Sequence, residues 1–311
     1  MADTTLFKTI LCPVDFSDHS RQALAYAALL TSRGKGRLVV IFVEDPMLVA
    51  AASVAYDQKA LIDKGRKELR RLVEKTIAPY GLRIENVTLD VAVGRPHEEI
   101  AWTAERLKCD VIVMGAHGRT RTDRLMLGST THRILRRSHL PVLATPPVAG
   151  RPHVPATNWP GKLVIAPIDL GARARADALA AAVVARELGT QLELVHVLEP
   201  ISNPPWLEVD ADRRNLQQQR LAEARLLRLK NELKGAAVAV RVESGRPADA
   251  IAKIASSKQV GLVVMTRRGG RGLFGPRQGS ISYQVLCKAN TPILALPSDT
   301  AWMRRIVRRA V

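Results

Sequence analysis

The chain has 311 residues, of which 47% are hydrophobic and 24% charged, and its formal net charge at pH 7 is +18. This length suits two domains of ordinary size, and the composition is that of a globular protein. No apolar run is long enough for a transmembrane helix, and the first residues lack the pattern of a secretion signal, so we expect a cytoplasmic protein. Cys12, Cys109 and Cys287 lie far apart, so we expect buried, reduced thiols and no disulfide frame or zinc site.

The first half of the chain alternates strand and helix patterns. Continuous apolar runs predict strands over residues 8–14 and 37–43, and apolar residues at helical spacing predict a helix over 18–32 between them. The elements predicted next are a long charged helix over about 57–79, a strand over 83–93, a helix opening at the Pro96 turn, a strand over 110–114, a glycine loop, a helix from about 129 and a strand over 141–145. This order is typical of a parallel sheet with helices on both faces.

The second half repeats the first. The sequence GRP at 94–96 recurs at 245–247, an offset of 151, whereas PVD at 13–15 corresponds to PID at 167–169, an offset of 154. The second copy has therefore lost a net three residues between its second strand and its GRP turn. We predict two tandem, doubly wound α/β domains, each with a five-stranded parallel sheet. The domains are expected over residues 1–147 and 162–297, with a linker over 148–161 and a basic tail over 298–311.

A ligand site is expected at the carboxyl ends of the strands in the first domain. Asp15 follows the first strand, and the fourth strand is followed by the sequence GAHG over 115–118, nine further residues, and then Gly128-Ser129. If the first and fourth strands are neighbours, these two features line one crevice. An Asp in that position can accept a hydrogen bond from a ribose hydroxyl or an adenine amino group.

The glycine loop has the chemistry of a phosphate cradle. Gly115 and Gly118 lack a Cβ, so backbone N–H groups can approach phosphate oxygens. Gly128 and Ser129 stand where a helix begins, so free N–H donors face the same anion. Thr130 adds a hydroxyl, and arginines such as Arg119 add positive charge. The alternative is that the glycines only form a turn and that Ser129 only caps the helix.

These residues resemble the universal stress protein family. The matching segments are PVDFS at 13–17, VGRPHEEI at 93–100 and, within 114–146, MGAHGRT, GSTTHRIL and PVLATP. The resemblance implies a Rossmann-like fold of the adenine nucleotide alpha hydrolase-like type, with ATP as ligand, with or without Mg²⁺, and AMP or ADP as alternatives. It also implies a homodimer, pseudo-twofold pairing of the domains within a chain, and a regulatory role in the stress response. The predicted nucleotide-binding residues of the first domain are Asp15, Val43, Met114, Gly115, His117, Gly118, Arg119, Gly128, Ser129 and Thr130.

The second domain departs from this pattern, because Thr266 stands where the first glycine belongs. A Cβ at this position crowds the approach of the backbone, although Thr offers a hydroxyl in exchange. The residues retained are Asp169, Val197, Gly269, Gly279 and Ser280. Whether this half binds nucleotide stays open.

The C-terminal tail is expected to form a basic amphipathic helix. Trp302, Met303 and Ile306 fall on one face, together with residues 307 and 310, and the arginines fall on the other. We expect the apolar face to pack against this chain or a second subunit. Contact with a membrane or nucleic acid is the alternative, which the net charge favours. Aromatic residues are only 4% of the chain, which leaves little material for stacking on bases.

We therefore predict an ATP-binding stress-response protein that acts through nucleotide-dependent conformation or contacts with an unknown regulatory protein partner. The alternatives are a nucleotide-independent docking or scaffold protein and a slow ATP hydrolase. The sequence contains no GxxxxGK[ST] loop and no evident general base, so we expect at most weak hydrolysis and name no catalytic or metal-binding residue. His97-Glu98-Glu99 is interpreted as the acidic first turn of a helix.

Overall fold

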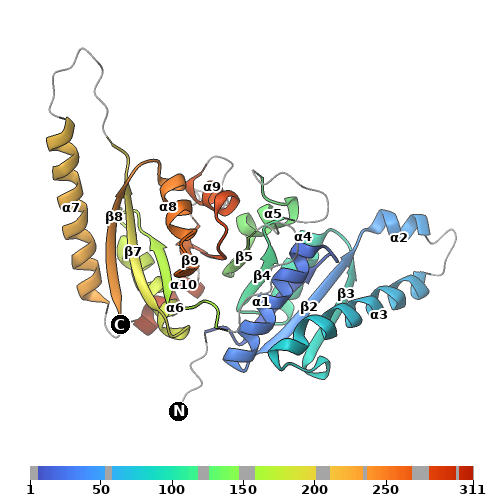
Figure 1. Cartoon of the computed structure of the whole chain (residues 1–311). Coiled ribbons are helices and arrows are strands. Elements are labelled where there is room, and N and C mark those ends of the chain that lie inside the picture. The colour runs from blue at the N-terminus through green and yellow to red at the C-terminus, as the bar shows by residue number, and fades with distance from the viewer. Residues whose placement is uncertain are drawn as a thin grey trace. The chain divides into compact units, whose positions relative to one another are not determined.

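The computed structural model describes residues 6–52, 58–117, 126–146, 158–200, 211–233, 237–267, 280–298 and 301–310. The chain divides into two compact units, the first ending at Trp159 and the second beginning at Pro160. Each unit contains strands with helices packed on both faces (Figure 1). The prediction of two tandem α/β domains is therefore confirmed.

The first domain is built on a parallel sheet. Its described strands are β1 (Thr9–Val14), β2 (Arg37–Glu44), β3 (Val87–Val93), β4 (Val111–Gly115) and β5 (Val142–Thr145). Their spatial order is β3-β2-β1-β4-β5, and each neighbouring pair is parallel. The order therefore reverses between β1 and β4, where Ile10 lies opposite Val111. A crevice at the carboxyl ends of these two strands is the usual ligand position in such a sheet.

Helices cover both faces of this sheet and bury its apolar side chains. On one face lie α1 (Asp18–Gly34) and α3 (Gln58–Ile77), which contact each other, and on the other lie α4 (Pro96–Arg106) and α5 (Ser129–Arg137) (Figure 1). Ile10 and Leu11 of β1, Leu24 of α1 and Leu69 of α3 are all fully buried. The helices thus fix the ends of the strands through one continuous core.

Two local features of the first domain differ from the sequence prediction. The strand predicted over 83–93 begins only at Val87, because Ile84–Asn86 form a 3₁₀ turn before it. A short helix, α2 (Pro46–Ala52), was not predicted. Its beginning is supported by Asp45, whose side chain accepts a hydrogen bond from the backbone N–H of Met47 (2.8 Å).

The second domain repeats this architecture. Its described strands are β6 (Leu163–Pro167), β7 (Gln191–Leu198), β8 (Val238–Ser244), β9 (Val260–Thr266) and β10 (Ile293–Leu296), in the parallel order β10-β9-β6-β7-β8. On one face lie α6 (Ala174–Glu187) and α7 (Ala211–Glu232), and on the other α8 (Pro247–Ala255) and α9 (Ile281–Lys288). The strands β2 and β7 begin 154 positions apart, at Arg37 and Gln191, whereas β3 and β8 begin 151 apart, at Val87 and Val238. The predicted deletion therefore lies between the second and third strands of the repeat.

The C-terminal helix α10 (Ala301–Ala310) packs against α6 of the same domain. Trp302, Met303 and Ile306 are buried, and Ile306 is fully so, whereas Arg304 and Arg305 are exposed. The expected packing of the apolar face against this chain is therefore what the structure shows. The side chains of residues 307–310, including Val307 and Ala310, lie outside the described part.

Within the described residues, no helix is both long and apolar enough to cross a membrane. The three cysteines are free and buried, as predicted. Burial raises the pKa of the Cys12 thiol well above its ordinary value and that of Cys109 to about 11, so both are protonated, unreactive thiols at neutral pH.

Candidate functional site

A crevice of about 470 Å³ opens at the carboxyl ends of β1, β2 and β4 in the first domain. It is where the reversal of strand order between β1 and β4 places a ligand. Eight residues predicted from the sequence line it: Asp15, Val43, Met114, Gly115, His117, Gly128, Ser129 and Thr130. The other two predicted residues of this domain, Gly118 and Arg119, lie outside the described residues.

Asp15 is held rigidly at one side of the crevice by the first turn of α1. Its Oδ1 accepts hydrogen bonds from the backbone N–H (3.0 Å) and the hydroxyl (2.5 Å) of Ser17, the residue that caps α1. Its own backbone N–H donates to the hydroxyl of Ser20 (3.2 Å). Between them, Phe16 adopts a left-handed conformation (φ 64°), which makes the sharp turn from strand to helix. The carboxylate is therefore positioned before any ligand arrives.

Gly115 ends β4 where a Cβ would be crowded. A Cβ built at this position would lie 3.0 Å from the Cβ of His19, 3.1 Å from the His19 carbonyl oxygen and 3.0 Å from the His117 carbonyl oxygen. The sequence predicts this glycine for close approach of a phosphate. The structure adds that Gly115 lets the chain after β4 pass directly over the first turn of α1.

The helix α5 begins at the opposite side of the crevice from β1. Its first turn is Ser129, Thr130 and Thr131, and its N-cap is Gly128, which has no side chain to satisfy the first backbone N–H groups. The hydroxyl of Thr131 donates to the carbonyl oxygen of Gly115 (2.7 Å), which fixes this turn to the end of β4. The positive end of the helix dipole therefore faces the crevice, which favours an anion there.

One detail of the predicted cradle is wrong. The backbone N–H of Gly128 was expected to be a free donor, but it donates to the carbonyl oxygen of Ala116 (2.8 Å). That hydrogen bond closes the loop between β4 and α5. The donors for a phosphate are therefore those of the first helical turn, at Ser129 and the residues after it. The alternative role of Ser129 as a helix cap does not hold either, since Gly128 occupies the cap position.

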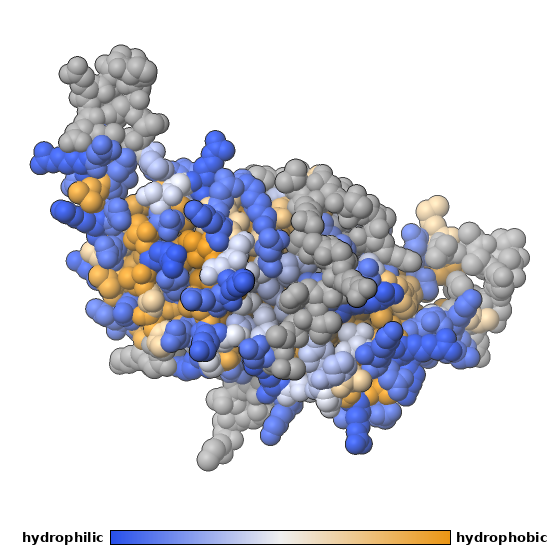
Figure 2. Space-filling view, viewed as in Figure 1, coloured by the Kyte–Doolittle hydropathy of each residue, from blue (hydrophilic) through white to orange (hydrophobic). Residues whose placement is uncertain are grey.

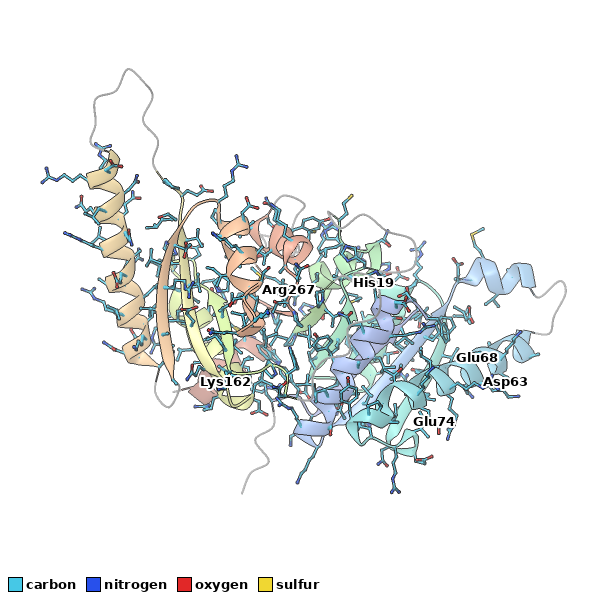
Figure 3. All side chains as sticks on the ribbon, viewed as in Figure 1. His19, Asp63, Glu68, Glu74, Lys162 and Arg267 are labelled. Atoms are coloured by element: carbon cyan, nitrogen blue, oxygen red, sulfur yellow. The ribbon has the colours of Figure 1, made fainter. Side chains whose placement is uncertain are left out.

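Two histidines lie side by side at the crevice, and His117 lines it. The rings of His19 and His117 are 5.6 Å apart between centroids, and His19 belongs to the first turn of α1 (Figure 3). Burial lowers the pKa of His19, and the negative charges of Asp15 and Asp18 oppose this only in part. His19 is therefore neutral at pH 7.

Sequence analysis missed several residues that line this crevice. Ser20 supports Asp15, Glu44 ends β2 and Asp45 follows it, and Pro96 and Ile100 belong to α4. Glu44 and Asp45 carried a usable signal, because polar residues at the end of a second parallel strand reach the same edge of the sheet as Asp15.

The second domain has a smaller crevice of about 370 Å³ at the equivalent place. Asp169 and Val197, both predicted, line it. Gly269 and Gly279 lie outside the described residues. Ser280 is the N-cap of α9, and its side chain accepts a hydrogen bond from the backbone N–H of Tyr283 (3.2 Å). The side chain of the cap residue thus occupies a backbone N–H of the first turn of α9, whereas Gly128, the cap of α5, has no side chain to do so.

Three substitutions between the repeats alter the chemistry of this second crevice. Thr266 replaces Gly115, Asp177 replaces Ala23, and Ile281 replaces Thr130. Asp177 is buried, with 7% of its surface exposed, and accepts a hydrogen bond from the Thr266 hydroxyl (2.9 Å). Its carboxylate and the exposed Ile281 side chain make this crevice less suited to phosphates than the first.

Comparisons with known proteins agree with the repeat. The family model described as "Universal stress protein family" matches residues 6–146 and again residues 162–297. Two universal stress proteins of Methanocaldococcus jannaschii are similar to one repeat unit. One is 32% identical over 142 residues, covering 44% of this chain and 81% of that protein, and the other is 29% identical over 157 residues, covering 45% and 95%.

A solved structure matches the whole tandem arrangement. The crystal structure of a universal stress protein from Archaeoglobus fulgidus superposes with a TM-score of 0.63 at 22% sequence identity, covering 93% of this chain and 98% of that chain. At this identity the likeness shows the fold alone. It places the two-domain α/β architecture among known structures.

Proposed function

We propose that this chain, which belongs to the universal stress protein family, binds an adenine nucleotide, foremost ATP, in the crevice of its first domain. The single observation that carries the proposal is that Asp15 and the start of α5, which no side chain caps, line one crevice. An acceptor for ribose or adenine and an anion site then face the same space of about 470 Å³. This volume is within the usual range for small-molecule sites.

The described residues fit the parts of the nucleotide. The first turn of α5 would receive phosphate oxygens, with the Ser129 and Thr130 hydroxyls as further donors. Asp15 would accept a hydrogen bond from the ribose or the base, and Val43 and Met114 would contact the base. If Mg²⁺ accompanies the phosphates, the Glu44 and Asp45 carboxylates line the same crevice.

We further propose that the first domain holds the principal nucleotide site. The second crevice has a buried carboxylate at Asp177, a capped helix start at Ser280 and an apolar side chain in place of Thr130. Each change removes or opposes an interaction with phosphate. The role that follows is regulatory: a bound nucleotide would stiffen the first domain and change its contacts with a protein partner.

The proposal is tested by identifying the nucleotide that purified protein releases on heating, using mass spectrometry, and by titrating ATP, ADP and AMP calorimetrically. The informative variant is Thr130→Asp, because an acidic residue in the first turn favours the helix but repels a phosphate placed there. We expect Thr130→Asp to keep the thermal transition and weaken ATP binding by about tenfold or more. Thr130→Ser is the matched control and retains binding.

Two outcomes distinguish the rival functions. No released nucleotide and no ATP binding by the wild-type protein would contradict the proposal and favour a nucleotide-independent docking protein. Steady release of phosphate from ATP, lost in Thr130→Asp, would instead identify a slow hydrolase. Sedimentation velocity with and without ATP tests the homodimer that the family resemblance implies.

A further inference from the structure

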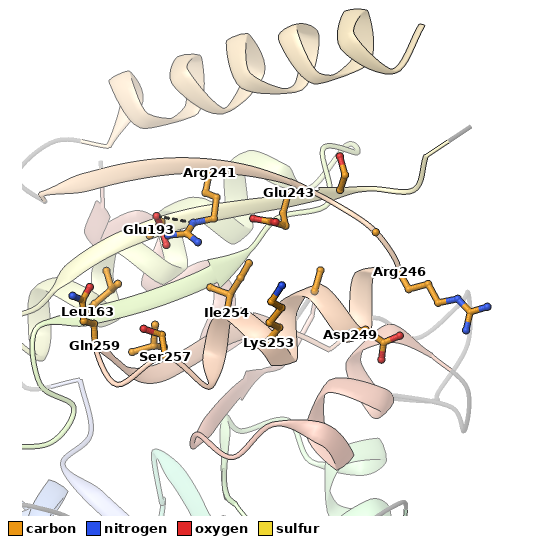
Figure 4. A pocket seen from close by; sticks show the side chains of 14 residues that line it. Leu163, Glu193, Arg241, Glu243, Arg246, Asp249, Lys253, Ile254, Ser257 and Gln259 are labelled. Atoms are coloured by element: carbon orange, nitrogen blue, oxygen red, sulfur yellow. Dashed lines mark hydrogen bonds and ion pairs between the residues drawn. The ribbon is translucent and has the colours of Figure 1, made fainter. Parts of the chain in front are cut away.

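We propose that a groove between β8 and α8 in the second domain binds a small zwitterion with an apolar side chain, namely an amino acid or a dipeptide. The groove has a volume of about 550 Å³ (Figure 4). It extends from Gly245 and Arg246, after β8, to Gln259 and Val260, at the start of β9. None of its lining residues lines the crevice of the same domain, so it is a separate site.

The groove exists because the second repeat lacks two large side chains that the first repeat has. At the offset of 151, Lys253 corresponds to Trp102 and Ser257 to Arg106. In the first domain the Arg106 guanidinium lies 4.5 Å from the centre of the Trp102 ring and forms an ion pair with Asp90 of β3. Those side chains cover the face of the strand there, whereas Lys253 and Ser257 leave the equivalent face open.

A buried acid lies in the wall of the groove. Glu193 of β7 is 9% exposed and stands where the first repeat has the apolar Val39. Its Oε1 accepts a hydrogen bond from Nε of Arg241 (3.1 Å), the contact drawn in Figure 4. Its Oε2 is buried and receives no hydrogen bond from the described residues. A carboxylate oxygen left in this state is costly, and a ligand ammonium group would remove that cost.

Arg241 gives a ligand access to this acid. Its side chain is 45% exposed, whereas that of Glu193 is only 12% exposed, so the guanidinium covers the carboxylate from the solvent side. A modest movement of Arg241 would let an ammonium group reach Oε2 while the guanidinium binds the carboxylate of the same ligand. This exchange keeps both charges paired.

The other charged residues of the lining are two acids, Glu243 and Asp249, and two bases, Arg246 and Lys253, and this balance favours a zwitterion. The side chains of Lys253 and Glu243 face the groove, and neither makes a hydrogen bond or an ion pair with another residue in the described part of the chain (Figure 4). Asp249 is already engaged by Lys288 (2.5 Å). A nucleotide would be repelled by the carboxylates, and a simple amine would be repelled by Lys253. A ligand with one charge of each sign satisfies both.

Apolar residues also line the groove and favour an apolar side chain on the ligand. They are Leu163, Ala250, Ile254 and Val260. Figure 2 shows hydrophobic residues at the surface of the second domain around β7 and β8, bordered by hydrophilic ones. Burying an aliphatic side chain there adds a favourable term of about 1.5–3 kcal/mol to the binding of the two charges.

The test is equilibrium dialysis of the full chain with radiolabelled L-leucine and L-leucyl-L-leucine. Each zwitterion is compared with two halves of leucine: 3-methylbutylamine, which lacks the carboxylate, and 4-methylpentanoate, which lacks the ammonium group. We expect saturable binding at one site per chain by at least one of the two zwitterions. Each half should bind about tenfold more weakly or worse.

Two variants place the site. Lys253→Trp with Ser257→Arg restores the side chains of the first repeat and should abolish binding by filling the groove. Glu193→Val removes the buried acid and should weaken binding by about tenfold, and the thermal transition should stay unchanged because Arg241, whose side chain is 45% exposed, can turn to the solvent. Thr130→Asp, in the first-domain crevice, should bind as the wild type does. No saturable binding by either zwitterion up to about 10 mM, equal binding by the half ligands, or unchanged binding in folded Glu193→Val would each overturn the proposal.

Discussion

The hydroxyl of Thr266, at the end of β9, donates a 2.9 Å hydrogen bond to Oδ1 of Asp177 in α6. The equivalent positions of the first domain are Gly115 and Ala23, which can make no such contact. The two substitutions therefore form one unit: a buried acid and the donor that makes its burial tolerable. The second repeat has replaced an open glycine turn by a polar contact between its first helix and its fourth strand.

Removing the donor should destabilise the second domain. Thr266→Val keeps the shape of the side chain but leaves Asp177 without this hydrogen bond, at a cost of about 1–3 kcal/mol. Urea unfolding followed by circular dichroism measures the free energy of unfolding. Thr266→Ser retains the hydroxyl and is the control. Equal stability of the Val and Ser variants would show that the contact contributes nothing.

A methyl group at Gly115 should destabilise the first domain. The Cβ of Gly115→Ala would lie 3.0–3.1 Å from backbone and Cβ atoms of His19 and His117, which cannot move independently. We expect a loss of about 1–3 kcal/mol in the free energy of unfolding, in addition to weaker nucleotide binding. Gly171→Ala is the control, because its nearest neighbour is the movable side chain of Asp169 at 3.3 Å. A fully stable Gly115→Ala protein would contradict the packing described above.

Stability should fall as the pH drops below about 6.5. Burial lowers the pKa of both His19 and His97, and for His97 the nearby Arg133 adds to the effect. Because the unfolded chain then binds more protons than the folded chain below the ordinary histidine pKa, protonation favours unfolding. The stability that neutral His19 and His97 contribute is complete above the ordinary histidine pKa. It is lost as the pH falls from the ordinary pKa through the lowered pKa values of the folded protein.

The measurement is the difference in the free energy of unfolding between pH 7 and pH 5.5. We expect His19→Gln with His97→Gln to reduce this difference, since neither glutamine titrates. His139→Gln, at an exposed histidine, should leave it unchanged. A pH dependence that is the same in all three proteins would assign the effect to other groups.

The fold could be predicted from the sequence because the same pattern occurs twice. Apolar runs mark the buried strands, and the change of offset from 154 to 151 locates the deletion between β7 and β8. Element ends were less predictable, since they depend on single hydrogen bonds. Gly128 caps α5 but Ser280, not Gly279, caps α9, so the two helices begin one residue out of register.

The pattern of residues predicted the candidate site where they follow a strand or begin a helix, whereas Val43 and Met114, within β2 and β4, came from the family resemblance. Asp15 and the segment from Gly128 to Thr130 meet that condition. Asp177 lies in the first turn of α6, but the sequence gives no sign of its role, because the threonine that it contacts is 89 positions away. The groove between β8 and α8 was equally hidden, since it results from side chains that the second repeat lacks, and only the fold shows what they covered in the first.

The C-terminal helix should stabilise the second domain through its apolar face. Ile306 is fully buried against the domain, so Ile306→Ala should lower the free energy of unfolding by about 2–5 kcal/mol. Replacing the exposed Arg304 and Arg305 by alanine should change it by about 0.5 kcal/mol or less. Chemical denaturation of the variants gives both values. If the tail served only as a membrane or nucleic-acid contact, replacing the arginines would weaken that binding, and neither change would alter the free energy of unfolding.

The asymmetry between the crevices leads to a gain-of-function prediction. Thr266→Gly, Asp177→Ala and Ile281→Thr together give the second crevice the residues of the first at these three positions. The triple variant removes the buried carboxylate, reopens the turn after β9 and supplies a hydroxyl at the start of α9. Each change should favour a phosphate, so we expect this domain to acquire ATP binding.

The experiment is cleanest in a protein whose first site is disabled by Thr130→Asp. Calorimetric titration of that background should detect little ATP binding, and adding the three substitutions should restore it at one site per chain. The control adds Thr266→Ser alone, which preserves the contact with Asp177 and should restore nothing. If the folded triple variant stays unable to bind ATP, the cap formed by Ser280 is the barrier that remains, because it still occupies the backbone N–H of Tyr283.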